Sequence, residues 1–217
     1  FIGFFDLQLA IIYDTQLLTS FEQLVWVGGI AEELKVSLFQ VSDFFHWIVA
    51  NTQSLDGRSE EEMNELIYRC ALLHTNHISQ GGDPFESGSS RPLDFGHWSA
   101  HKMEQLTGYA LRHGEAVALG ICIDLAYARL KGYITEALFE EVLGLFTDLG
   151  FPMALPEGIQ AEQVLKGIEE FREHLGGELT ITLIKGVGHQ YDVHEIDQAL
   201  MAQAIEVMKA PTLHRTS

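Results

Sequence analysis

Histidines and acidic residues gather in one stretch of the sequence, DFGHWSAHKME, and a triplet HGE follows it. His97 and His101 in this stretch are four residues apart, so on a helix the two imidazoles share a face and can bind one cation. Glu104, His113 or Glu115 could supply a third ligand. The same spacing also fits polar residues on a solvated helix, and ten histidines in one chain produce some close spacings by chance. Spacing alone is compatible with a divalent metal site but does not establish one.

A second candidate group lies in the stretch GGIAEELK, where Glu32 and Lys35 are three residues apart. Side chains at this spacing lie on one face of a helix. An ordinary surface ion pair is the simpler interpretation. Gly28 and Gly29 precede the pair, and adjacent glycines permit close approach of another helix or of a ligand.

The overall composition excludes several classes of partner. Asp and Glu number 31 against 13 Lys and Arg, which gives the 217-residue chain a net charge of -18. A surface this acidic repels phosphate backbones and anionic lipids, so nucleic acid and membrane partners are not expected. No apolar run reaches the length of about 20 residues that a membrane span needs. Two cysteines, Cys70 and Cys122, are too few for a disulfide framework, so we expect a reducing compartment, the cytoplasm.

Hydrophobic periodicity predicts a mainly α fold, a multi-helical domain with a small β-hairpin. The apolar segment 114–130 is predicted to be buried on most sides, with the other helices wrapped around it. Ser20 is predicted to cap the first helix and Thr135 a later one. A short strand is expected at 9–13, and a hairpin from LTITLI and YDV joined by KGVGHQ. Helices are expected at 21–40, 42–50, 58–78, 96–105, 114–130, 135–149, 161–174 and 194–208.

The stretch SQGGDPFESGSSRPL at 79–93 is rich in Gly, Ser and Pro and is predicted to be a loop that leads into the histidine cluster. No G-x-G-x-x-G follows a strand and no GxxxxGK[ST] is present, so the sequence carries no recognisable phosphate loop for a nucleotide.

The histidine stretch resembles the metal-site signature of a known family. The run G-H-x-x-x-H-x-x-E, followed by HGEAVALG, looks like that of 3-dehydroquinate synthase and related sugar phosphate cyclases. The segment from Asp14 to Lys35 is similar to the family's stretch that leads into its glutamate ligand. The hairpin segment LGGELTITLIKGVG is also similar to a late hairpin of the family. The similarity therefore spans nearly the whole chain.

The resemblance implies three metal ligands, Glu32, His97 and His113. One carboxylate and two imidazoles leave coordination positions open, as in a catalytic rather than a structural metal site. Zinc suits these ligands and cobalt would too. The ligand pair suggested by spacing alone is thereby revised, because His101 is implied to face the substrate.

Further roles follow from the same resemblance. It implies that Lys35 and His101 act on the substrate as catalytic residues, and that Ser20 lies near a bound NAD. It also implies a nucleotide-binding α/β domain that holds most of the NAD and is not in this chain. Residues 1–20 would then be an interdomain strand and linker at the end of that domain, 21–209 the helical metal-binding domain, and 210–217 a frayed tail. A homodimer is the family expectation.

Several positions implied to bind substrate depart from the family pattern. Asp94 stands where the members that act on the usual substrate have Asn, and Ser90 where they have Arg, although Arg91 is adjacent. His74 and Arg172 stand where lysines are expected. Losing cationic and amide groups changes how a phosphate or carboxylate is held. We therefore expect a cyclase for a different sugar phosphate rather than 3-dehydroquinate synthase itself.

Three functions compete. The first is a metal- and NAD-dependent carbon–oxygen lyase that cyclises a sugar phosphate and eliminates phosphate. The second is a non-catalytic descendant that keeps the metal site as an interaction or sensing module. The third, independent of the family, is a metal hydrolase with His97 and His101 as ligands and Glu104 as base.

Overall fold

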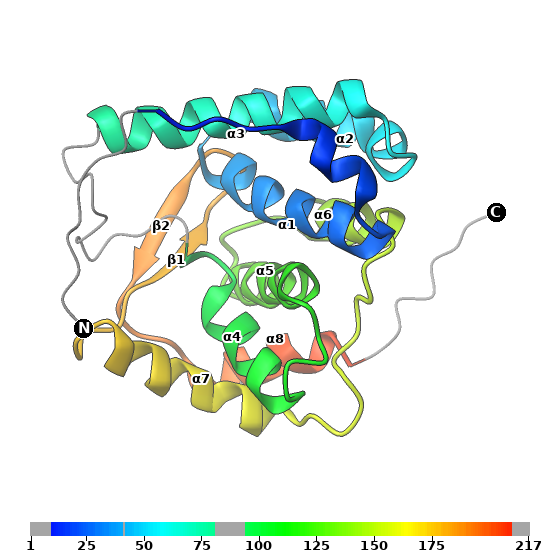
Figure 1. The fold of residues 1–217 in the computed structure, drawn as a ribbon. Helices are drawn as coiled ribbons and strands as arrows, with labels where there is room; N and C mark the ends of the chain where they lie inside the picture. Colours follow the sequence, from blue (N-terminus) through cyan, green and yellow to red (C-terminus); the bar gives the residue numbers. More distant parts are fainter. Residues whose placement is uncertain (1–9, 41, 81–93, 210–217) are drawn as a thin grey trace, which may run out of the picture.

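The computed structural model describes residues 10–40, 42–80 and 94–209 (Figure 1). Within these residues the chain forms one 3₁₀ helix, eight α-helices and one two-stranded antiparallel hairpin. In chain order the elements are η1 (Thr15–Ser20), α1 (Gln23–Gln40), α2 (Ser42–Asp56), α3 (Glu60–Gln80), α4 (His97–Leu106), α5 (His113–Leu130), α6 (Glu136–Asp148), α7 (Ala161–His174), β1 (Ile181–Ile184), β2 (Gln190–Val193) and α8 (Gln198–Val207).

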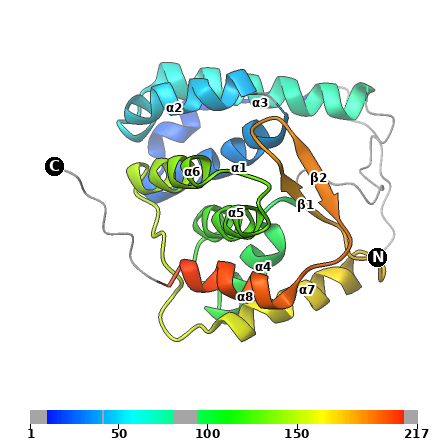
Figure 2. The same ribbon diagram turned by 180° about the vertical axis from the view of Figure 1, so that it is seen from behind.

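Helix α5 is the centre of the fold. Every residue from Ala116 to Ala128 is buried, as expected for a helix that is apolar on all sides. It packs against α1, α4, α6, α8 and strand β1. The other elements surround α5 in both views (Figures 1 and 2). Its first residue, His113, is exposed, at the end of the helix that lies outside the buried stretch.

The remaining elements form layers on two sides of α5. Helices α2 and α3 lie beyond α1, on the side away from α5, whereas α7 and α8 close the opposite side next to α4 (Figure 1). The β-hairpin covers a third side. All four residues of β1 are buried, and Ile181 pairs with Val193 at one end and Ile184 with Gln190 at the other.

Two pairs of glycines let α5 approach its neighbours with backbone against backbone. A Cβ added to Gly114 would lie 2.5 Å from the Cα of Gly28 in α1. A Cβ added to Gly120 would lie 2.0 Å from the carbonyl oxygen of Gly96, the residue before α4. Since real Cβ atoms do not come this close, only glycine fits at these positions of α5. The close approach that Gly28 permits is thus made by helix α5.

The predicted fold class is confirmed, with differences at element ends. Helix α7 has the predicted bounds, and the Thr135 side chain accepts from the Leu138 N–H as a cap of α6. The strand expected at 9–13 is wrong for residues 10–13, which form no strand and expose Ile12 to 92%. The predicted cap at Ser20 is also wrong, because this residue ends η1 and donates to the Leu17 carbonyl.

Two further predictions concern the start of the last helix and the loop at 79–93. The last helix begins at Gln198 with Asp197 as its cap, four residues later than predicted. Most of the expected loop at 79–93 lies outside the described residues. Among the helices that the structure describes, none is both long and apolar enough to span a membrane.

Candidate metal centre

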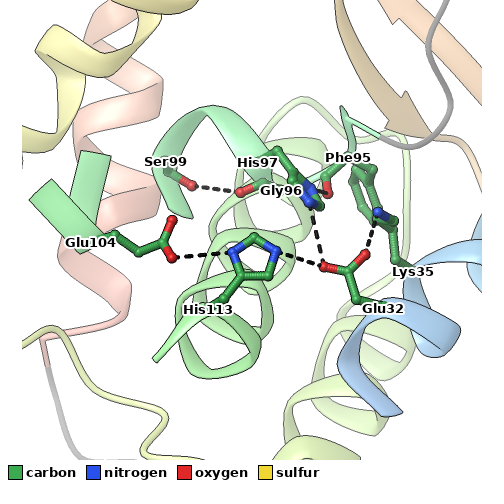
Figure 3. Close-up of polar contacts among 8 residues, drawn as sticks. All are labelled: Glu32, Lys35, Phe95, Gly96, His97, Ser99, Glu104 and His113. Carbon is green, nitrogen blue, oxygen red and sulfur yellow. Dashed lines mark hydrogen bonds and ion pairs between the residues drawn. The ribbon is translucent and has the colours of Figure 1, made fainter. Parts of the chain in front are cut away.

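Three helices each direct one side chain at the same point (Figure 3). Glu32 comes from the middle of α1, His97 from the start of α4 and His113 from the start of α5. The Oε1 atom of Glu32 lies 3.4 Å from Nε2 of His97 and 3.2 Å from Nε2 of His113. One ligand atom from each residue lies within 4.8 Å of the others, a group of three that the described part of the chain brings together.

The second nitrogen of each imidazole has a partner of its own. Nδ1 of His97 lies 3.1 Å from the carbonyl oxygen of Phe95, and Nδ1 of His113 lies 3.2 Å from Oε1 of Glu104 (Figure 3). A carbonyl and a carboxylate can only accept, so both Nδ1 atoms carry the proton. In the neutral imidazoles, both Nε2 atoms then present lone pairs towards Glu32.

The Glu32 carboxylate is divided between two roles. Its Oε2 accepts from the Lys35 ammonium at 2.6 Å, and Lys35 itself is only 3% exposed. Its Oε1 is buried and accepts no hydrogen bond of good geometry, although two imidazoles are close. Burial opposes ionisation of Glu32, but His113, His97 and the charge of Lys35 together hold its pKa well below the usual range. Glu32 is therefore an anion at neutral pH.

This arrangement fits a divalent cation. Three lone pairs, from one anionic oxygen and two imidazole nitrogens, face one another and require positive charge between them. Ligands of one tetrahedral zinc ion, at about 2.0–2.1 Å from the metal, lie about 3.3 Å from each other, close to both measured separations. Glu32 also favours a positive charge on His113 itself. Its contact with the imidazole raises the pKa of His113 and outweighs the opposing effect of partial burial.

The local fold explains why the two histidines meet. After α4 the chain reverses through Gly108 and Tyr109, both at positive φ, so α5 starts beside α4. The Tyr109 N–H donates to the Glu104 carbonyl at 2.7 Å, which tightens this turn. The Glu115 carboxylate then accepts from the Arg112 N–H at 2.9 Å and caps the first turn of α5, where His113 stands.

His101 lies beside the cluster but not in it. Its ring centroid is 5.5 Å from that of His97 and 5.9 Å from that of His113. The pair expected from spacing alone, His97 with His101, is thus not the pair that converges, because Glu32 approaches from α1 on the side of His113. Glu104, the base in the hydrolase hypothesis, is instead held on Nδ1 of His113.

A cavity of about 290 Å³ opens next to the cluster, between α4 and α7. Asp94, His97 and His101 line one side, and Glu170 and His174 are among the residues on the other. Burial lowers the pKa of His101, with a smaller contribution from His97, so its imidazole is neutral at pH 7. The cavity therefore joins a candidate metal ligand to a neutral imidazole and two carboxyl groups.

The other predicted site residues are more scattered. Arg172 pairs with Glu169 on its own helix and does not line the cavity, although Phe171 and His174 beside it do. His74 is exposed on α3, and Ser20 is exposed at the end of η1. Arg91 lies outside the described residues.

Sequence reasoning missed two residues that support the cluster. The sequence suggests Glu104 as a ligand or a base, and only the structure shows it as the partner of His113. The second is Asp124, whose signal in the sequence is that a single acidic residue within the apolar run of α5 needs a buried partner. It accepts from Trp98 and Gly96, which flank His97.

The fold and the cluster define a mostly helical domain with a candidate Glu–His–His metal centre, and comparison with known proteins places it in a family. A model described as 3-dehydroquinate synthase C-terminal matches residues 29–172. The chain therefore belongs to the 3-dehydroquinate synthase C-terminal family.

Curated relatives agree with this family assignment. The chain is 28% identical over 210 residues to a 3-dehydroquinate synthase of Xylella fastidiosa, covering 94% of this chain and 56% of the relative. It is 30% identical over 206 residues to that of Haemophilus ducreyi, with the same coverage. The chain thus spans just over half the length of these relatives.

Two solved structures share the fold. A 2-epi-5-epi-valiolone synthase from Streptomyces hygroscopicus subsp. jinggangensis, with NAD+ and Zn2+ bound, matches with a TM-score of 0.82 at 23% identity, covering 90% of this chain and 54% of that one. A 2-deoxy-scyllo-inosose synthase complexed with carbaglucose-6-phosphate, NAD+ and Co2+ matches with a TM-score of 0.69 at 18% identity, covering 90% and 55%.

Proposed function

We propose that this chain is the metal-binding part of an enzyme that cyclises a sugar phosphate and eliminates phosphate, with a divalent metal and NAD as cofactors. The observation that carries the proposal is the convergence of Glu32, His97 and His113, with both Nδ1 atoms held by acceptors. Membership of the family supports the reaction class. The solved structures of similar fold hold NAD+ with Zn2+ or Co2+, which supports the cofactor pair. A cytoplasmic homodimer, as expected for the family, completes the proposal.

Glu32, His97 and His113 would hold zinc or cobalt. The metal would polarise substrate oxygens and fix their orientation, and NAD would supply a reversible oxidation of one alcohol. The chain's own groups prepare this site. Lys35 holds Oε2 of Glu32, so that Oε1 stays directed at the imidazoles. His101 is neutral at pH 7, and a ring nitrogen can accept a proton from a substrate hydroxyl in the adjoining cavity.

The cavity favours a substrate rich in hydroxyl groups. Asp94 and Glu170 both line it, and the Lys102 ammonium is bonded to Glu170. Carboxyl oxygens accept hydrogen bonds from hydroxyls, which supports binding of the hydroxyl-bearing part of a sugar at this side of the site. Asp94 in place of the family's Asn supports a reaction different from that of 3-dehydroquinate synthase.

Phosphate release by the full-length protein tests the proposal. With NAD and Zn2+ or Co2+ supplied, we expect release from at least one heptulose or hexose phosphate in a panel that includes carboxylated and uncarboxylated sugars. His97→Ala should abolish release, whereas His46→Ala, which alters a histidine on α2, should retain it. Absence of release across the whole panel, in a protein loaded with metal and NAD, would contradict the proposal.

The second candidate function is a non-catalytic metal-binding module. It is favoured by the positions of His74 and Arg172, which stand where lysines are expected and do not line the cavity. Such a module would bind metal without affinity for NAD. A full-length protein that copurifies with NAD would count strongly against it.

A further inference from the structure

Asp124 is a buried acid in the middle of an apolar helix. It lies on α5 and is 0% exposed. Both of its oxygens accept hydrogen bonds from the segment that carries His97. Oδ1 accepts from the indole Nε1 of Trp98 at 2.8 Å, and Oδ2 accepts from the backbone N–H of Gly96 at 2.9 Å.

These two donors belong to the residues on either side of His97. Gly96 has φ of 77°, and the backbone of α5 leaves no room for a side chain there. Trp98 is only 1% exposed. One carboxylate therefore holds in place both the backbone of Gly96 and the side chain of Trp98.

Stability alone does not explain this acid. An uncompensated buried carboxylate costs several kcal/mol, and even a paired one is often no better than an apolar side chain of similar volume. The carboxylate instead fixes an orientation. Its two hydrogen bonds hold the first turn of α4 at one rotation about the helix axis. The same helix, α5, carries His113 at its start, so the carboxylate joins two elements that bear candidate ligands.

We propose that Asp124 is a positioning residue for the metal site: it fixes the start of α4 so that Nε2 of His97 is directed at Glu32 and His113. This proposal rests on the metal site proposed above. Partners that orient a metal ligand typically change metal affinity by about 10–100-fold when they are altered. Asp124 acts one step further out, through the residues that flank the ligand, so we expect an effect of about tenfold.

The test uses the full-length protein and Co2+ as the probe, at a pH about one unit above the pKa of about 7 that burial gives Asp124, so that its carboxyl is ionised. Asp124→Asn keeps the shape but turns an amide N–H towards one of the two donors. Tyr127→Phe is the matched control, because it removes the part-buried hydrogen bond that the Asp197 backbone N–H donates to the Tyr127 hydroxyl, away from α4. We expect Asp124→Asn to weaken Co2+ binding about tenfold, measured by chelator competition, and to shift the visible absorption bands of the bound Co2+. Tyr127→Phe should lower the Tm and leave both readouts unchanged.

Trp98→Phe covers the case in which Asp124→Asn does not fold, because it removes one donor and leaves the carboxylate in place. It should weaken Co2+ binding in the same direction by a smaller factor. If the folded variants at 98 and 124 match the control in affinity and in spectrum, Asp124 has only a structural role and the proposal is overturned. A wild-type protein that binds Co2+ but releases phosphate from no sugar would overturn the proposed reaction and leave this test of positioning intact.

Discussion

The two candidate imidazole ligands are oriented in different ways. His97 is held by a backbone carbonyl, which no substitution can remove, and is only 13% exposed. His113 is held by the side chain of Glu104 and is half exposed. The orientation of His113 therefore depends on one replaceable carboxylate, which makes the contribution of that carboxylate measurable.

We predict that Glu104→Ala weakens metal binding by about 10–100-fold, because Nδ1 of His113 loses its acceptor and the ring loses its orientation. Glu104→Gln should have a smaller effect, since the amide oxygen can still accept from Nδ1. The measurement is the Zn2+ or Co2+ dissociation constant by chelator competition. Glu170→Gln is the control, because Glu170 bonds Lys102 rather than a candidate ligand. Equal dissociation constants for Glu104→Ala and the control would contradict the prediction.

Asp124 also makes stability depend on pH. Burial raises its pKa to about 7, against the opposing effect of the hydrogen bonds from Trp98 and Gly96. In the unfolded chain an aspartate titrates at about 4. Between these values the folded protein holds a proton that the unfolded chain has released, so the free energy of unfolding falls as the pH rises. The stabilising contribution is complete below pH about 4 and is lost by pH about 7.

We predict that the difference in free energy of unfolding, wild type minus Asp124→Asn, declines between pH about 4 and about 7 and is flat above it. Urea denaturation of the metal-free protein across this range provides the measurement. Glu33, whose pKa burial raises to about 8, is present in both proteins and cancels in the difference. A difference that rises with pH would show that Asp124 is already ionised in the folded state at low pH.

At the scale of elements, the site depends on how closely the helices approach α5. Gly114 faces Gly28, one helical turn before Glu32, and Gly120 faces Gly96, next to His97. Both close approaches therefore set the position of a candidate ligand. Glycines in the HGEAVALG run are thus packing positions that bring α1 and α4 close enough to α5 for the ligands to converge.

We predict that Gly120→Ala lowers the free energy of unfolding by about 1–3 kcal/mol or more, because the new Cβ would lie 2.0 Å from the Gly96 carbonyl oxygen. It should also weaken metal binding, since α4 must move away from α5. Gly144→Ala on α6 is the matched control. Nothing lies within 4 Å of its added Cβ, so we expect a gain of about 0.5–1 kcal/mol from helix propensity. Urea denaturation and Co2+ titration of both variants check the prediction. A tolerated Gly120→Ala would mean that the close approach is not needed for the site.

At the scale of the whole molecule, local patterns predicted the elements well. The apolar helix α5, the capped helix α6 and the hairpin all follow from periodicity and turn residues in short windows. The prediction was wrong where the surroundings of a segment, rather than its own sequence, decide its structure. The segment 10–13 is apolar enough for a strand, but it forms none in the described structure, where Ile12 is largely exposed.

Local sequence patterns predicted less of the candidate site than of the fold. Spacing found His97 but paired it with His101, because a sequence pattern cannot show which face of α4 meets α1. Glu32 joins the cluster only because α1 packs on α5 at Gly28, a contact between residues far apart in the chain. The resemblance to the family supplied the candidate ligand set that spacing could not. The supporting partners of the histidines required the three-dimensional structure.

Because the three candidate ligands come from α1, α4 and α5, a metal bound by them should stabilise the whole domain. At a free metal concentration of about 100 times the dissociation constant, the gain is about 2.7 kcal/mol, or a rise in Tm of about 5–10 °C for a domain of this size. We predict this rise on adding Zn2+ to the full-length protein and its reversal by a chelator, measured by calorimetry. Glu32→Gln and His97→Ala should remove most of the rise, whereas His46→Ala should keep it, because its imidazole lies on α2 and contacts Ser42. If His97→Ala shows the same rise as the wild type, the metal binds elsewhere and the three residues are not its ligands.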